Sequence, residues 1–295
     1  MNVLGEFQAH RGLLFGLAYR MLGSVADAED VLQDAWLRFE AVPSDTVRSP
    51  KAFLSTLVTR LCLNQLESAR ARRETYVGPW LPEPIRTDRP ELATTVPPPS
   101  ERIEMLESIS IAFLVLLEQL SPAERAVFLL HKVFDLPYDD IADMVGKDAA
   151  TCRQLGSRAA KHLAGHRTRF RSTPDHHRRL LEHFMSAVGS GSYDALIQLL
   201  TDDVTLWADG GGSVRGAATR PLHGHDAVAR FVLSSTRFLP DAAAPEIVEV
   251  NGEPAAILRV GENVVFVIAI AARDDRIAEI RVLANPAKLR WLSNP

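Results

Sequence analysis

The stretch LPYDDIADMVGKDAATCRQLGSRAAKHL, residues 136–163, predicts two short helices joined by a tight turn. Gly146 tolerates a left-handed backbone and can end the first helix, and Asp148 can cap the second. The second helix has an apolar stripe made of Cys152, Leu155, Ala159 and Leu163. The stretch therefore predicts a helix-turn-helix.

The opposite face of the second helix carries polar side chains of the kinds that read DNA. This face comprises Arg153, Gln154, Ser157, Arg158 and Lys161. Arg pairs with guanine and Gln with adenine in the major groove, so the face suits sequence recognition. An ordinary surface helix with solvated charges shows the same pattern, and the helix pair alone leaves both interpretations open.

Composition limits the class of protein. The chain has 295 residues, 46% of them hydrophobic, which is enough for two or three domains. No apolar run is long enough to span a membrane, and the N-terminus lacks a signal-peptide pattern. Cys62 and Cys152 lie in separate predicted helices, so we expect no disulfide framework and a cytoplasmic location.

The net charge of −4 hides a segregation of charge along the chain. Residues 27–40 are acidic, whereas residues 70–73 and 147–179 are rich in Arg and Lys. Basic clusters beside a helix-turn-helix suit phosphate contacts, and the acidic run suits a different partner. Either run can also be a solvated surface.

The first 75 residues predict an all-helical domain. An apolar stripe runs through residues 4–22, and a second helix is predicted for DAEDVLQDAWLRF, residues 27–39. A third helix begins at Ser49-Pro50 and continues through KAFLSTLVTRLCLNQLESARARR to residue 73.

These helices resemble region 2 of a sigma factor of the extracytoplasmic-function class, within the sigma-70 family. The helix-turn-helix, preceded by LLEQLSPAERAVFLLHKVFD at residues 116–135, resembles region 4. Two such blocks in this order are much more specific than either alone. The resemblance implies a region 2 helical bundle at residues 1–75 and a region 4 helix-turn-helix domain at residues 101–165.

The resemblance also implies partners and site residues. The acidic helix would dock on the clamp helices of the RNA polymerase β′ subunit through Asp27, Asp30, Gln33 and Asp34, with Trp36 mainly in the core. The minus-10 element of promoter DNA would meet Arg48, Lys51, Arg60 and Asn64. In region 4, Arg153, Gln154, Ser157, Arg158 and Lys161 would contact the minus-35 element, and part of the domain would meet the β-flap.

Residues 76–100 are a proline-rich linker, which excludes continuous helix. Its segment Trp80, Leu81, Pro82, Glu83 and Pro84 is unusual, because a solvated linker rarely carries adjacent Trp and Leu. Local packing on region 2 is one interpretation. The resemblance favours another, a docking peptide, since WLPEP is typical of sigma factors with a SnoaL-like C-terminal domain.

Residues 175–295 predict an α+β domain. Two helices in residues 176–200 and one near residues 226–234 accompany four strand-like runs, at 204–207, 256–260, 264–271 and 277–283. The last three runs suggest an antiparallel set. The order resembles the SnoaL-like cone, which holds a pocket between a curved sheet and its helices.

Two further motifs in this domain accompany it in such sigma factors. They are Asp209-Gly210-Gly211-Gly212 and Asn285-Pro286-Ala287-Lys288-Leu289. The family more often has Asp at the position of Ala287. The triple glycine permits a close backbone approach to another surface, and WLPEP is our candidate for that surface.

Catalytic chemistry has weak support in this sequence. Cone-shaped enzymes use Asp and His, and Asp209, His223, His225 and Asp226 are available near the expected pocket. Turn, cap and surface roles explain them more simply. Two histidines without a third ligand do not define a metal site. We therefore predict no enzyme, no metal and no cofactor.

The sequence favours a sigma factor that binds core polymerase and directs it to specific promoters. Its fused cone would regulate it in cis by contacting the linker and region 2, with tethering raising the effective concentration. The alternative is a ligand-sensing or enzyme-like cone fused to a repressor-type DNA-binding module. The sequence leaves open whether the cone binds a small ligand. We expect a monomer that does not bind membranes.

Overall fold

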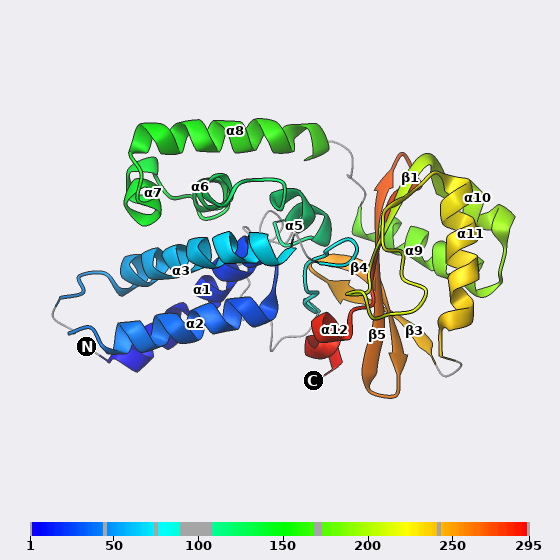
Figure 1. The fold of residues 1–295 in the computed structure, drawn as a ribbon, viewed down its shortest axis with the longest axis horizontal. Helices are drawn as coiled ribbons and strands as arrows, with labels where there is room; N and C mark the ends of the chain where they lie inside the picture. The colour runs from blue at the N-terminus through cyan, green and yellow to red at the C-terminus, as the bar shows by residue number, and fades with distance from the viewer. Residues whose placement is uncertain are drawn as a thin grey trace. The chain divides into compact units, whose positions relative to one another are not determined.

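The computed structural model describes residues 2–43, 46–73, 76–88, 108–167, 173–240 and 243–293. Contacts divide the chain into two compact units (Figure 1). The first unit comprises Met1–Glu74, Pro90–Ile109 and Phe113–His166. The second comprises Thr75–Arg89, Ser110–Ala112 and Arg167–Pro295, so the described part of the linker groups with the C-terminal domain.

Three helices form the N-terminal part of the first unit: α1 (Val3–Leu22), α2 (Val25–Glu40) and α3 (Pro50–Arg73). They lie side by side in Figure 1 and bury the predicted apolar stripes, including Leu17, Leu32 and Leu54. Gly23 ends α1 with φ 67°, and the Ser24 hydroxyl caps α2 by accepting from the Asp27 amide. The predicted helical bundle is confirmed.

The second part of this unit contains most of α5 (Ile111–Leu117), α6 (Pro122–Lys132), α7 (Tyr138–Val145) and nearly all of α8 (Ala149–Arg167). Ser121 and Glu124 form a capping box at the start of α6. Gly146 ends α7 with φ 70°, and Asp148 accepts from the Thr151 amide at 2.8 Å. The predicted helix-turn-helix is therefore present as α7 and α8.

Two arginines join the parts of the first unit at helix ends. Arg125 in α6 is 3% exposed, and its Nη1 donates to the Met21 carbonyl at the end of α1, 2.6 Å away. The Arg60 side chain in α3 donates to the Asp143 carbonyl at the end of α7, at 2.7 Å. Cations suit both places, because the last carbonyls of a helix lack partners and carry partial negative charge.

The second unit is an α+β domain. Its helices are α9 (Pro174–Gly189), α10 (Tyr193–Leu199), α11 (His225–Ser235) and α12 (Pro286–Ser293), with a 3₁₀ turn η2 (Thr236–Phe238). Its strands are β1 (Leu200–Asp209), β2 (Leu222–His223), β3 (Ala244–Val250), β4 (Glu253–Val260), β5 (Asn263–Arg273) and β6 (Arg276–Leu283).

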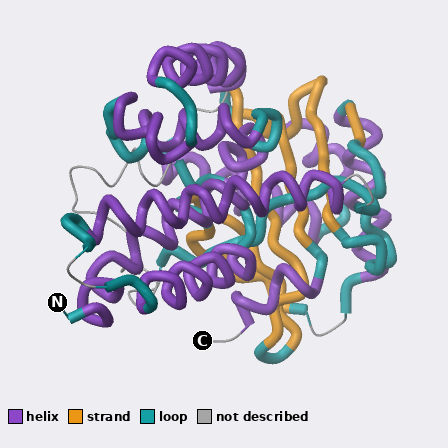
Figure 2. Tube along the Cα trace, turned by 60° about the vertical axis from the view of Figure 1, so that its left-hand side comes forward, coloured by secondary structure: helices purple, strands orange, loops and turns teal. Residues whose placement is uncertain are grey.

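The six strands form one mixed sheet in the order β2-β1-β6-β5-β4-β3, drawn in orange in Figure 2. The β3–β6 strands form an antiparallel meander, which confirms the predicted antiparallel set and extends it by β3. β1 pairs with β6 in parallel, an arrangement the sequence pattern did not indicate. β3 is an edge strand, and its open side receives the linker.

Both faces of the sheet are covered. The faces alternate along each strand, so Ile280 packs against the cluster that includes Phe184 of α9 and Val228 of α11. Residues that face the other way, such as Val267 and Leu283, are also fully buried. In Figure 1, α9 and α11 lie on one side of the sheet and α12 on the other.

No helix in the described parts of the chain combines the length and apolar character needed to cross a membrane.

Candidate functional site

The acidic helix α2 presents a polar face. Asp30, Gln33 and Asp34 are exposed along it, as a polymerase-binding face requires. Asp27 is half-buried instead, and its carboxylate accepts a bond from Gln65 of α3 at 2.8 Å. Trp36 is also half-buried and meets Phe7 edge-on, with ring centroids 5.2 Å apart.

The candidate minus-10 residues lie on and just before α3. All four residues are exposed: Arg48, Lys51, Arg60 and Asn64. Arg60 differs from the others, because its guanidinium is held by the two backbone carbonyls of Asp143 and Met144. Its Nε and Nη2 atoms are therefore engaged within the first unit.

The candidate recognition helix α8 has its two faces as predicted. Cys152, Leu155, Ala159 and Leu163 are buried, and the five polar residues from Arg153 to Lys161 named above are exposed. Gly156 permits the close approach of α7, since a Cβ there would lie 2.8 Å from the Tyr138 Oη. Tyr138 in turn packs on His131, with ring centroids 4.1 Å apart.

The linker and the C-terminal domain meet at a buried carboxylate. Asp209, at the end of β1, is 0% exposed. It accepts bonds from the Leu81 amide at 2.8 Å, the Tyr76 hydroxyl at 2.5 Å and Lys288 Nζ at 2.6 Å. We call Tyr76, Leu81, Asp209, Asn285 and Lys288 the linker-docking cluster.

Lys288 completes the linker-docking cluster from α12. It is 6% exposed, and its Nζ also donates to the Leu81 carbonyl at 2.5 Å. The same ammonium lies 4.2 Å from the centroid of the Trp80 ring, within the range of a cation–π contact. Burial and the bond to Asp209 raise the pKa of Tyr76, so its hydroxyl stays protonated and keeps donating.

A second set of contacts extends the linker along the edge of the sheet. Ile85 and the fully buried Asn251 exchange bonds: the Ile85 amide donates to Asn251 Oδ1 at 2.9 Å, and the Asn251 amide donates to the Ile85 carbonyl at 2.8 Å. Arg86 pairs with Val250 as an antiparallel bridge, and the Thr87 amide donates to the Glu249 carbonyl. The linker thus adds a short strand beside β3.

The triple glycine makes close approach possible at two of its positions. Gly211 has φ 58°, and a Cβ there would lie 2.5 Å from Asn285 Nδ2. Gly212 has φ 75°, and a Cβ there would lie 2.9 Å from the Val77 side chain. Side chains at these positions would be strained, and one at Gly212 would push Val77 of the linker away.

The structure thus brings together most residues of WLPEP in the linker and of the two motifs in the C-terminal domain. Leu81, Pro82, Glu83 and Pro84 are buried, and Trp80 is half-buried. Asp209, Gly211, Gly212, Asn285 and Lys288 contact the linker or one another, Gly210 follows Asp209, Pro286 begins α12, and Leu289 is buried in it. Ala287 is exposed.

Sequence reasoning missed several residues of this contact. Tyr76 precedes WLPEP, and its hydroxyl bridges Asp209 and the Asn285 amide nitrogen. Asn251, with φ 54°, sits in the tight turn after β3. An aromatic residue at the start of a polar linker and an Asn-Gly pair between strands were the available signals.

The polar residues considered for catalysis have local partners. His223 lies 3.1 Å from the Thr205 hydroxyl, and Asp226 binds Arg230 and Tyr193. His225 lies 3.7 Å from Asp202. Among the residues that the structure describes, no three His, Cys, Asp or Glu side chains are grouped to hold a metal.

Comparison with known families supports both helical domains. The family model for sigma-70 region 2 matches residues 7–72, which include α2 and most of α3. The model for sigma-70 region 4 matches residues 110–163, which include the helix-turn-helix.

Curated relatives match along almost the whole chain. ECF RNA polymerase sigma factor SigJ of Mycobacterium tuberculosis is 36% identical, with 97% of this chain and 92% of SigJ covered. A probable ECF RNA polymerase sigma factor, SigI, of the same organism is 32% identical, covering 97% and 94%. The crystal structure of SigJ covers 99% of both chains, with a TM-score of 0.75 and 32% identity. With its region 2 bundle, its region 4 helix-turn-helix and its fused α+β domain, this chain therefore belongs to the ECF RNA polymerase sigma factors.

Proposed function

We propose that the C-terminal domain regulates this sigma factor in cis by holding the linker between regions 2 and 4. As an ECF sigma factor, the chain directs RNA polymerase to specific promoters for transcription initiation and is not an enzyme. The observation that carries the proposal is the buried Asp209 carboxylate, which receives the Leu81 amide and the Tyr76 hydroxyl from the linker.

Holding residues 76–88 on the C-terminal domain reduces the length of linker that is left to separate the two DNA-reading regions. With residues 76–88 fixed on the C-terminal domain, residues 74–75 and 89–107 remain on either side of it. A shorter connection restricts the distances and orientations that regions 2 and 4 can adopt. Tethering gives the contact an effective concentration on the order of millimolar, so even a weak interface is occupied.

The individual contacts with polymerase and promoter are part of the same proposal. Asp30, Gln33 and Asp34 form the exposed acidic face of α2 and would bind the β′ clamp helices. Arg48, Lys51, Arg60 and Asn64 would contact the minus-10 element, although Arg60 also donates to the α7 carbonyls. The exposed face of α8 would contact the minus-35 element, where Arg and Gln suit base edges and Lys suits phosphate.

A repressor-type module with a sensing cone explains less. A repressor has no use for an exposed acidic helix of the region 2 type, and the relatives that match along almost their entire length are sigma factors.

Reconstituted transcription with core RNA polymerase tests the proposal. The forms to compare are the full chain, a form ending at Pro174, and Trp80→Ala with Asp209→Ala. Trp291→Ala is a matched control, because this Trp is 41% exposed on α12 and lies outside the linker-docking cluster. Trypsin cleavage after Arg86, which is 9% exposed, reports release of the linker independently.

We expect the double variant to expose Arg86 to trypsin and to change transcript yield in the same direction as the truncation. Trp291→Ala should behave as the parent in both assays. The regulatory proposal fails if linker release leaves transcript yield at the parent's level. The assigned polymerase and DNA contacts fail separately if substitution of the exposed residues leaves core binding and promoter binding unchanged.

A further inference from the structure

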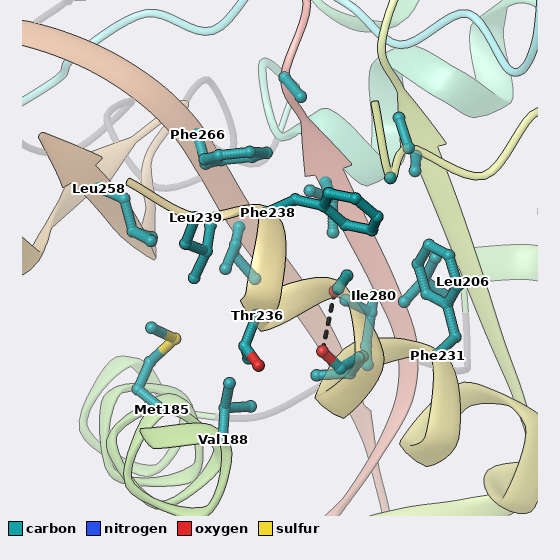
Figure 3. A pocket seen from close by; sticks show the side chains of 18 of the residues that line it. Met185, Val188, Leu206, Phe231, Thr236, Phe238, Leu239, Leu258, Phe266 and Ile280 are labelled. Carbon is teal, nitrogen blue, oxygen red and sulfur yellow. Dashed lines mark hydrogen bonds between the residues drawn. The ribbon is translucent and has the colours of Figure 1, made fainter. Parts of the chain in front are cut away.

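The second unit contains an apolar cavity of about 90 Å³ between its helices and its sheet. Met185 and Val188 of α9 border it on one side, and Phe266 of β5 and Ile280 of β6 border it on the sheet side (Figure 3). Phe238 of η2, which is 43% exposed, also lines it. The cavity therefore reaches from the core towards the surface.

The chemistry of the cavity wall selects against polar and charged occupants. The two hydroxyls that line it already donate to backbone carbonyls, Ser235 to Val232 at 2.8 Å and Thr236 to Leu233 at 2.7 Å. Arg215 is the one charged residue among the lining residues, and it is exposed. A charged group placed inside would lose its hydration without gaining a partner, whereas a hydrocarbon surface loses nothing.

The cavity and the linker-docking cluster share the end of β1 and the two residues that follow β6. Ala208 of β1 lines the cavity, and the next residue, Asp209, holds the linker. Ala284 lines the cavity as well, and the next residue, Asn285, binds the Tyr76 hydroxyl. Neighbouring residues of a strand point to opposite sides, and the amides of Ala284 and Asn285 both donate to the Asp209 carbonyl. A shift of this strand end therefore moves the cavity wall and the linker contacts together.

The loop after Asp209 provides a second connection. A Cβ on Gly210 would lie 2.6 Å from the Ala217 Cβ, so the loop folds tightly back on its own start. Gly216 has φ 85°, and a Cβ there would lie 2.6 Å from the Phe238 ring. Contacts therefore run without a break from Phe238 through the loop to the residue beside Asp209.

We propose that this cavity binds an uncharged, apolar small molecule and that its occupancy weakens the hold on the linker. An occupant larger than the cavity displaces Phe238, and Phe238 is packed against the loop at Gly216. The loop then shifts at Gly210 and disturbs the bonds of Asp209. The claim that an occupant changes transcription rests on the proposed function. Binding in the cavity and its coupling to the linker do not rest on it.

Binding is tested on the full chain with N-phenyl-1-naphthylamine, an uncharged fluorescent probe. We expect saturable binding that Val188→Phe, which fills the cavity, weakens at least about tenfold. Val188→Ala enlarges the cavity and should strengthen binding, so this variant answers the question if Val188→Phe does not fold. Leu4→Phe is a matched control, since Leu4 is 55% exposed on α1. Absence of saturable binding, or equal affinity in all four proteins, overturns the site.

Coupling is tested with Asp209→Asn, which weakens the linker contact. Linkage is reciprocal, so a probe that loosens the linker must bind more tightly when the linker is already loose. We expect about fivefold tighter binding by Asp209→Asn and faster trypsin cleavage after Arg86 when the probe is added to the parent. Equal affinities and unchanged cleavage overturn the coupling. If both change while transcript yield does not, the coupling stands and the proposed regulation fails.

Discussion

The ion pair between Asp209 and Lys288 is unusual for its burial. Moving two charges out of water is costly, and the cost is offset only when both ions have good partners. Here the carboxylate accepts three bonds from the linker-docking cluster, and the ammonium donates to Asp209 and to the Leu81 carbonyl. Three groups of the linker, the Tyr76 hydroxyl and the amide and carbonyl of Leu81, thus help to compensate the buried charges.

Removal of both partners should therefore cost less than the sum of the two single removals. Lys288→Met leaves Asp209 buried without a counter-ion, and we expect a loss of about 3 kcal/mol in the free energy of unfolding. Asp209→Asn combined with Lys288→Met should cost clearly less than the sum of the single variants. Urea unfolding of the four proteins measures this cycle, and additive losses would show that the two charges do not interact.

His177 of α9 should make the stability of the second unit depend on pH. It is 7% exposed, and burial, followed by the nearby His176, lowers its pKa from 6.5 to about 4. The unfolded state therefore takes up the proton first as the pH falls. The stability that the neutral ring contributes is complete above pH 6.5 and is lost as the pH falls towards 4.

We expect His177→Gln to remove up to about 3 kcal/mol of the difference between unfolding free energies at pH 7 and pH 4. His183→Gln is the control, because His183 is exposed on the same helix. Urea unfolding at several pH values gives the comparison. A parallel pH profile for His177→Gln and the parent would contradict the assignment.

At the scale of elements, the helix-turn-helix depends on one close approach. Gly156→Ala should force Tyr138 away from α8 and lower stability by about 1 kcal/mol, despite the better helix propensity of Ala. Gly189→Ala in α9 meets nothing within 4 Å and should raise stability slightly. Thermal unfolding should show opposite signs, and equal shifts would mean that the α7–α8 contact adapts freely.

Helices were predictable from sequence because their signals are local. Stripes at helical spacing, the Ser121–Glu124 capping box and Gly146 all lie within one or two turns of the boundary that they mark. β3 was missed, since its sequence APEIVEV has Pro245 and two Glu residues and reads as a polar segment. An edge strand tolerates such residues, so its pattern is weak.

The candidate site was predictable in part. The exposed face of α8 and the motif residues around Asp209 could be identified, because fixed spacing or resemblance marked them. The bonds from Arg60 to the α7 carbonyls and from Gln65 to Asp27 could not. Each joins two helices that are far apart in sequence, and no local pattern encodes such a pairing.

At the scale of the whole molecule, the two sigma regions form one unit in this structure. Arg125 holds them together: besides the Met21 carbonyl, it binds the Leu117 carbonyl at 2.9 Å and Glu118 at 2.7 Å. Burial lowers its pKa to about 9, so the guanidinium stays charged at neutral pH.

Arg125→Met should therefore loosen region 4 from region 2 before it unfolds either. The Met21 and Leu117 carbonyls lose their donor, and Glu118 loses its counter-ion, at a cost of about 3 kcal/mol. Hydrogen exchange should accelerate at the end of α1 and at the start of α6. Lys132→Met, at an exposed position of α6, is the control. Unchanged protection in Arg125→Met would exclude this coupling.

The pairing of the linker with β3 has one more consequence. An open sheet edge is a template on which other chains can add strands, and natural proteins cover such edges to avoid aggregation. Here Ile85, Arg86 and Thr87 occupy the open side of β3, so the segment that we propose to restrain the sigma regions also shields the sheet from self-association. Release of the linker should therefore also raise the tendency of the molecule to self-associate through β3. A short lifetime of the released state would limit this association.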